Sequence, residues 1–191
     1  MYIAKVCRIV TVAPFMAGTM LVVLFINNPV VFGNSAFFAA ALVFLTVLPL
    51  LAYPLQPLFS HYRSKGREGQ RTLAMLFAAA GYVLGCALAF IAHAPNSLKI
   101  IFLSYLFSAI LIILFNKLIH VRASGHACGV AGPFAILVFF GQLAGFLGII
   151  PLVIVWWSSL KAKRHTPGQL IVGTALPFLA LAAAMTLIYA M

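Results

Sequence analysis

Long apolar segments, repeated along the whole chain, constrain the fold more than any other feature of this sequence. Of its 191 residues, 65% are hydrophobic and only 7% are charged, far from the averages of soluble domains. The segments approach the roughly 20 apolar residues that a helix needs to cross a lipid bilayer. They are too long and too many for a cleaved signal peptide to explain. No polar stretch is long enough to build a soluble core, so we expect an integral membrane protein.

The apolar segments predict an all-α, polytopic transmembrane bundle of six or seven spans, forming a single membrane domain over residues 1–191. The expected spans cover about 7–27, 36–59, 73–93, 98–116, 126–145, 147–160 and 169–190. The fifth and sixth are the hardest to separate, because residues 127–157 carry no charge and are long for one helix but short for two. Three glycines and a proline favour a tight break there and a short sixth helix; they are Gly141, Gly145, Gly148 and Pro151.

Basic residues are distributed unevenly between the two faces of this predicted bundle. The chain has twelve Lys and Arg residues but one acid, Glu68. Counting spans from the N-terminus places Lys99 alone on one face. The other eleven share the N-terminal face: Lys5, Arg8, Arg63, Lys65, Arg67, Arg71, Lys117, Arg122, Lys161, Lys163 and Arg164. By the positive-inside rule, we expect this basic face in the cytoplasm.

The charge and cysteine patterns exclude several functional classes. Basic chains often bind nucleic acid, but these cations are confined to short loops between spans, so we expect anionic headgroups or phosphates as partners and no nucleic acid. A single acid excludes an enzyme built on two carboxylates. The cysteines Cys7, Cys86 and Cys128 are scattered without a CxxC spacing, so neither a disulfide framework nor a metal site is expected. We expect no cofactor.

Two short segments on the basic face contain the residue types that suit phosphate chemistry. They read Arg-Ala-Ser-Gly-His at 122–126 and His-Thr-Pro-Gly-Gln at 165–169. Each lies where an apolar helix is expected to meet water. The predicted topology places both on one side of the membrane, together with the loop at 62–71. We therefore expect these loops to form one phosphate-binding region.

The two histidine segments suggest a division of roles in phosphoryl transfer. Ser124 and Gly125, at a helix start, would offer a hydroxyl and backbone N–H groups to an anion. His126 would donate a proton to a leaving oxygen, and His165 would attack phosphorus. Gln169 lies at i+4 from His165. We expect its amide oxygen to accept from the imidazole Nδ1–H and to leave Nε2 free.

Each of these assignments has a simpler competing explanation. Cations near the segments would neutralise the charge of a transferring phosphoryl group; the candidates are Arg67, Arg71, Lys117, Arg122, Lys161 and Arg164. Ordinary positive-inside anchoring is the competing reason for basic residues, and it is the one we adopt for Lys5, Arg8, Arg63 and Lys65. For His126 and His165, the competing role is an interfacial histidine that caps or bonds a neighbouring helix.

In order and spacing, these residues resemble the type 2 phosphatidic acid phosphatases, relatives of the vanadium haloperoxidases. That family carries a Lys-x6-Arg-Pro segment, then Pro-Ser-Gly-His, then Ser-Arg-x5-His-x3-Asp. Here Ser124-Gly125-His126 is similar to the second motif, with Ala123 in place of its proline. The first motif is not present as written; Arg67 and Arg71, or Lys117 and Arg122, are the alternatives for it. The resemblance covers about residues 60–190.

The third motif is matched in part. Ser159 stands where the family has arginine, and Gln169 stands where it has aspartate. His165 keeps the spacing of the motif histidine, and Gly173 occupies a position where the family often has glycine. Three cations are candidates to replace the lost arginine: Lys161, Lys163 and Arg164.

The resemblance implies a metal-independent phosphatase of a bacterial cell membrane. Its substrate would be a phosphate or diphosphate ester on a phospholipid or polyprenyl carrier. His126 would protonate the leaving group, and His165 would form a phosphoenzyme that water hydrolyses. Bacterial members of the family commonly act on the outer face, whereas the charge count here predicts the inner one.

Two other functional classes compete with an active phosphatase. Because an amide does not stabilise an imidazolium as a carboxylate does, Gln169 predicts slower turnover. The alternative is therefore a catalytically weak or inactive relative that binds headgroups or serves as a structural membrane subunit. A small transporter is disfavoured, because polar or charged residues in mid-span would mark its pathway and the spans contain almost none.

Overall fold

The structure is a computed structural model that describes residues 12–191, and this part of the chain is helical without a strand. Five segments are long and apolar enough to cross a membrane: Ser35–Leu58, Gly66–Ile91, Asn96–Lys117, Leu143–Lys161 and Pro167–Ala190. Two shorter apolar helices accompany them, α2 (Ala13–Asn27) and α8 (Gly125–Phe139). The predicted all-α membrane protein is confirmed. Lys5, Cys7, Arg8 and the start of the first predicted span lie outside the described residues.

The first of the five segments changes its helical geometry along its length. It comprises α3 (Ser35–Leu42), the wider π-type turn η2 (Val43–Val47), α4 (Leu48–Leu55) and the tight 3-10 turn η3 (Gln56–Leu58). Asn34 starts it, because its side chain accepts a hydrogen bond from the Phe37 N–H at 2.9 Å and satisfies a donor at the helix start. Pro49 follows the wide turn and Pro57 lies in the tight one, as expected of residues that lack a backbone donor.

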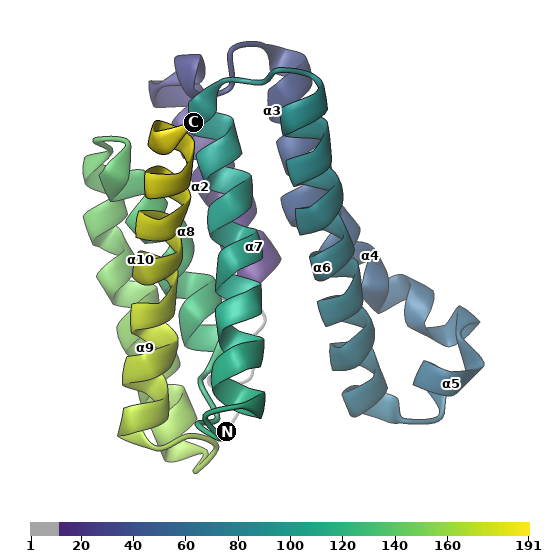
Figure 1. The fold of residues 1–191 in the computed structure, drawn as a ribbon. Helices are drawn as coiled ribbons and strands as arrows, with labels where there is room; N and C mark the ends of the chain where they lie inside the picture. Colours follow the sequence, from purple (N-terminus) through teal and green to yellow (C-terminus); the bar gives the residue numbers. More distant parts are fainter. Residues whose placement is uncertain (1–11) are drawn as a thin grey trace.

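A helical hairpin forms the middle of the fold. The short helix α5 (Ser60–Arg63) leads into α6 (Gly66–Ile91), which a turn joins to α7 (Asn96–Lys117). The turn lies at the opposite end of the molecule from α5 (Figure 1). Gly85 allows the two helices to pack closely, because a Cβ at this position would overlap the Phe102 ring. Small residues at helix contacts are typical of membrane bundles.

The remaining helices pack on the other side of α7. The last helix, α10 (Pro167–Ala190), lies along both α7 and α8, whereas α4 and α6 form a neighbouring pair (Figure 1). Helix α8 also packs against α2 and against the 3-10 segment η4 (Leu143–Gly148). Helix α9 (Ile149–Lys161) continues from η4. This arrangement brings the starts of α8 and α10 to the same end of the bundle.

The break between the fifth and sixth predicted spans lies earlier than expected. Helix α8 ends at Phe139, and Gly141 adopts a φ of 74°, a left-handed conformation that favours glycine. The next apolar segment is therefore longer than predicted, because η4 and α9 together form Leu143–Lys161. The other two glycines serve packing instead of turning. A Cβ at Gly145 would meet Val138, and one at Gly148 would overlap the Phe134 ring.

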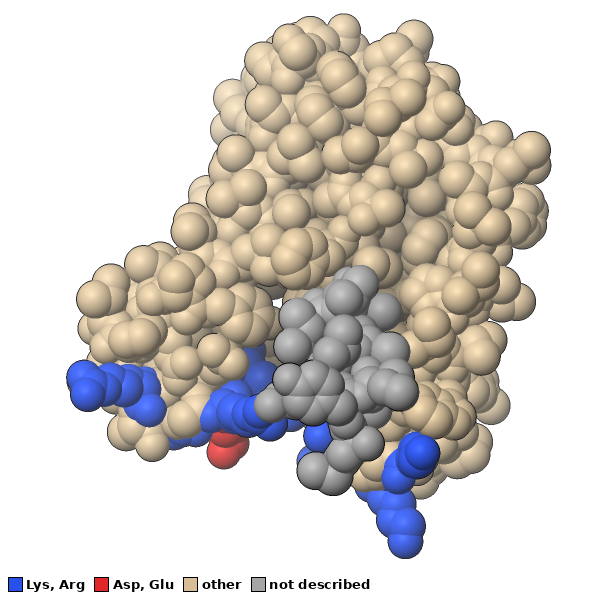
Figure 2. Space-filling model, turned by 180° about the vertical axis from the view of Figure 1, so that it is seen from behind, with Lys and Arg blue, Asp and Glu red and all other residues tan. Residues whose placement is uncertain are grey.

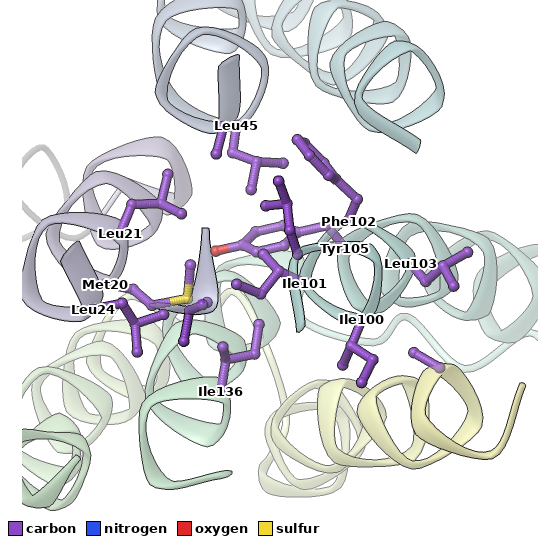
Figure 3. Packing of buried hydrophobic residues seen from close by; sticks show 14 of the residues in the cluster. Met20, Leu21, Leu24, Leu45, Ile100, Ile101, Phe102, Leu103, Tyr105 and Ile136 are labelled. Carbon is purple, nitrogen blue, oxygen red and sulfur yellow. The ribbon is translucent and has the colours of Figure 1, made fainter. Parts of the chain in front are cut away.

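The main hydrophobic core draws residues from most of the helices, including α6 and α10 (Figure 3). Its fully buried side chains include Met20, Leu21 and Leu24 of α2, Leu45 of η2, Ile101 and Phe102 of α7 and Ile136 of α8. A smaller cluster of Ala127, Val130, Val155 and Leu170 joins α8, α9 and α10. Ala127 follows His126 and Leu170 follows Gln169, so this second cluster sets the two predicted site segments in register.

Substitution of Gly85 by valine is expected to destabilise the bundle. The added side chain would overlap the Phe102 ring, and overpacking of this kind costs about 1–3 kcal/mol. Gly168→Ala is the matched control, because no atom lies within 4 Å of the position of its added Cβ. Thermal unfolding in detergent, followed by circular dichroism, should show a lower midpoint for Gly85→Val alone. Equal midpoints for the two variants would contradict the packing described.

Candidate functional site

The basic residues gather at one end of the molecule. Figure 2 shows Lys and Arg side chains at this end, with the single acid, Glu68, among them. They lie in or next to the connections between α5 and α6, between α7 and α8, and between α9 and α10, which are at the same end of the bundle (Figure 1). Lys99, in the first turn of α7, is at the opposite end. The predicted separation of Lys99 from the other described cations is therefore present.

His165 is held by the start of the last helix. Thr166 is the N-cap of α10, and Pro167 occupies its first turn. The Gln169 N–H donates to Thr166 Oγ1 at 3.4 Å, and the Thr166 N–H donates to Gln169 Oε1 at 3.2 Å. This reciprocal pair is a capping box, which satisfies two backbone donors of a helix start. Gln169 Oε1 also lies 3.0 Å from His165 Nδ1.

The capping box determines which ring nitrogen of His165 holds a proton. Because the Thr166 N–H donates to the Gln169 side chain, the accepting atom must be the amide oxygen. An amide oxygen has no proton to give, so His165 Nδ1–H is the donor in their 3.0 Å contact. In the neutral imidazole, the lone pair is then on Nε2. The contact predicted from the i+4 spacing is present, and its catalytic role stays a prediction.

A backbone hydrogen bond joins the two histidine segments. The Ser124 N–H donates to the Gln169 carbonyl oxygen at 3.1 Å. One turn along α10, Gly173 packs directly on Ser124, since a Cβ at this position would overlap the Ser124 backbone. The glycine is therefore required by the close approach of α10 to the start of α8. Segments 39 residues apart, as counted from His126 to His165, thus form one structural unit.

His126, the second residue of α8, is electrostatically coupled to this unit. Burial, together with the nearby charges of Arg71 and His165, lowers the pKa of His126 to about 4. Loss of solvent disfavours the charged imidazolium, and neighbouring cations act in the same direction. His126 is consequently neutral near pH 7 and becomes protonated only as the pH falls toward 4. Arg71 and His165 therefore both lie within electrostatic range of His126.

The structure gives the other predicted residues different surroundings. Ser124 is fully buried, and its hydroxyl oxygen accepts from the Ala127 N–H at 3.3 Å as the N-cap of α8. Gly125, which follows it, is exposed. Lys117 and Arg122 are exposed residues flanking the loop between α7 and α8. Their proximity to the histidines stays a prediction.

Three cations are candidates to replace the arginine of the family motif, and none of them is buried. Lys161, Lys163 and Arg164 are all exposed. Lys161 Nζ lies 4.8 Å from the centre of the Trp157 ring, which is a favourable cation–π contact. Arg67 lines a pocket together with Arg63. Ser159, at the position of the arginine in the family motif, is buried.

Two supporting contacts were not predicted from the sequence. The Thr-x-x-Gln pattern at 166–169 is the signature of a capping box and was readable in principle. The second is a hydrogen bond from Trp156 Nε1 to Thr174 Oγ1 at 3.1 Å, which fixes α9 against α10. No local sequence pattern reveals the partner of Trp156, which lies 18 residues away.

The described residues contain no group of three His, Cys, Asp or Glu side chains arranged to hold a metal ion. Cys86 and Cys128 are free thiols. Comparison of the chain with protein-family models, with curated proteins and with solved structures finds no match.

Replacement of Gln169 by leucine should release the ring of His165. The wild-type protein is expected to hold neutral His165 with its proton on Nδ1, because Gln169 Oε1 accepts there. Nitrogen-15 NMR of histidine-labelled protein, assigned with His165→Ala, distinguishes the two tautomers. Gln169→Leu should shift the population toward Nε2–H, whereas Gln142→Leu, at the other end of the bundle, should not. A wild-type Nε2–H tautomer would contradict the assignment.

Proposed function

We propose that the chain is a membrane-embedded lipid phosphatase similar to the type 2 phosphatidic acid phosphatases. Its substrate would be a phosphate or diphosphate ester on a phospholipid or polyprenyl carrier. We also propose that one or both of the shorter helices α2 and α8 cross the membrane, which would give a bundle of six or seven spans. The observation that carries it is the junction of Ser124 and Gln169, which places His126 and His165 in one structural unit.

The proposed reaction begins with attack by His165 on phosphorus. The Nε2 lone pair forms an N–P bond while the bond from phosphorus to the lipid oxygen breaks. Gln169 accepts from Nδ1–H throughout and keeps Nε2 directed as the nucleophile. His126 gives its proton to the departing lipid oxygen. Water then attacks the phosphohistidine and releases phosphate, with the proton of that water returning to His126.

His126 must be protonated before it can act as the acid in this reaction. Its pKa of about 4 applies to the site without a substrate, where Arg71 and His165 disfavour a further positive charge. A bound phosphate is anionic, and an opposite charge nearby raises the pKa of a histidine. Substrate binding would therefore raise the pKa of His126 and favour its protonated form. Arg71 would balance the charge on the phosphoryl oxygens.

Replacement of His165 by alanine is expected to abolish phosphate release. The assay uses purified protein in detergent with phosphatidate, phosphatidylglycerophosphate and a polyprenyl diphosphate as separate substrates. His126→Ala should lower the rate by about 10²–10⁴-fold, the usual contribution of a general acid. His120→Ala is the control, because His120 is an exposed residue of the adjoining loop. Undiminished release by His165→Ala would exclude the proposed nucleophile.

A catalytically weak or inactive headgroup-binding protein is the second candidate. Two observations favour it. Ser159, at the position of the motif arginine, is buried and uncharged. Lys161, a candidate to replace that arginine, has its Nζ over the Trp157 ring. The charge that the family motif supplies at this position is thus missing. Gln169 is also neutral, so it stabilises a cationic imidazole less than a carboxylate would. Both differences would leave binding intact while slowing the chemical step.

Restoring both motif residues tests this second candidate. The double variant Ser159→Arg, Gln169→Asp should increase phosphate release if the native residues limit the chemical step. Ser158→Arg, Gln169→Asp is a matched control, because Ser158 is also buried at the end of α9 but is not the motif position. Activity that appears only in the restored variant would identify the native chain as inert. Comparable rates in the native and restored proteins would remove the basis for the second candidate.

We further propose that the basic end faces the cytoplasm of a bacterial cell. The separation of Lys99 from the other described cations supports this orientation through the positive-inside rule. In a background with all three native cysteines replaced by serine, Lys65→Cys or Lys163→Cys should resist an impermeant thiol reagent in intact cells. Lys99→Cys should react. The reverse labelling pattern would place the site on the outer surface.

A further inference from the structure

Hydrogen bonds and close backbone packing hold the corner between α5 and α6 together. Gln56 Nε2 donates to the Tyr62 carbonyl oxygen at 3.0 Å and to the Gly66 carbonyl oxygen at 2.7 Å. Gly69 packs on the same Tyr62 carbonyl, where a Cβ would overlap it. Gly66 adopts a φ of 51° at the start of α6, in the region that favours glycine. One side chain and two glycines therefore fix the shape of a short connection at the basic end.

This corner contains a pocket with two guanidinium groups. The pocket has a volume of about 390 Å³ and is lined by Gln56, Pro57, Arg63, Gly66, Arg67 and Gln70. Glu68 is the only Asp or Glu in the chain, and within residues 12–191 no ion pair joins it to either arginine. The positive charges of Arg63 and Arg67 are therefore available to an anion. Guanidinium groups bind phosphate through paired N–H donors.

The pocket lies at the level where lipid headgroups are expected. One candidate membrane span ends at Leu58, and the next begins at Gly66, so the corner connects two spans at the edge of the bilayer. Leu58 is 77% exposed and Phe59 is 42% exposed. Apolar side chains beside basic ones are typical of a surface that contacts both the acyl region and anionic headgroups.

We propose that this corner is a second lipid-binding site, in which Arg63 and Arg67 hold the phosphate of an anionic phospholipid whose chains lie against Leu58 and Phe59. We distinguish it from the proposed phosphatase site, since its lining includes none of His126, His165 and Arg71. Arg63 was expected to serve only as a topological anchor, and Arg67 to bind the reacting phosphate. Their shared pocket gives both a role in retaining a lipid that is not hydrolysed.

The test measures which lipids stay bound to the full chain. Purified protein in nanodiscs of equal phosphatidylcholine and phosphatidylglycerol is released into the gas phase, and native mass spectrometry counts the retained lipids. Wild type should retain phosphatidylglycerol preferentially. Arg63→Gln, Arg67→Gln should lower that preference by about tenfold, as expected for loss of two charge-assisted contacts. The His165→Ala protein should behave like wild type, which separates this result from any failure of the proposed phosphatase.

A charge-matched variant distinguishes lipid binding in the pocket from attraction of the lipid to the basic end as a whole. Lys65→Gln, Lys163→Gln removes two cations from the same end of the molecule, and neither lines the pocket. This variant should keep its preference within about twofold, while Arg63→Lys, Arg67→Lys should show a partial loss, because lysine keeps the charge but not the paired donors. Equal losses in the two glutamine variants, or none in either, would overturn the proposal. Binding of inorganic phosphate in detergent without retention of phosphatidylglycerol would also overturn it, since the site would then take a free anion.

Discussion

The bilayer interior offers no hydrogen-bond partners to a protein backbone, and this constraint organises the whole molecule. It requires continuous helices through the apolar layer and leaves charged side chains at the ends of those helices. In this chain, the described cations other than Lys99 occur at the end of the bundle that contains three of its connections (Figure 1). That end therefore offers an anionic group most of the described cations.

Within that end, the contact between the starts of α8 and α10 positions the candidate site. The Ser124 N–H bonds the Gln169 carbonyl, and Gly173 allows the two backbones to approach. The same residue, Gln169, uses its side chain to cap α10 and to hold the ring of His165. Helix stability and the orientation of a candidate nucleophile are thus coupled, so a change at Gln169 acts on both.

The sequence predicted features that depend on local spacing. The apolar segments indicated a helical membrane protein, and the i+4 spacing of His165 and Gln169 predicted their contact. The sequence did not predict the 3-10 segment η4, because Gly145 and Gly148 resemble a turn but serve packing against α8. It also did not separate Arg67 from Arg71, which are one turn apart on α6. Only the fold places Arg67 in the corner pocket and Arg71 within electrostatic reach of His126.

The proposed chemistry depends on one atom, Nε2 of His165, since Nδ1 is engaged by Gln169. The most direct test is rapid quenching of the protein with a substrate that carries a radiolabelled phosphate, followed by location of the label. We expect a transient, acid-labile phosphohistidine at position 165 with phosphorus on Nε2. Label on Nδ1 of His165 or on another residue would contradict this mechanism. Phosphate release without any labelled protein would also contradict it.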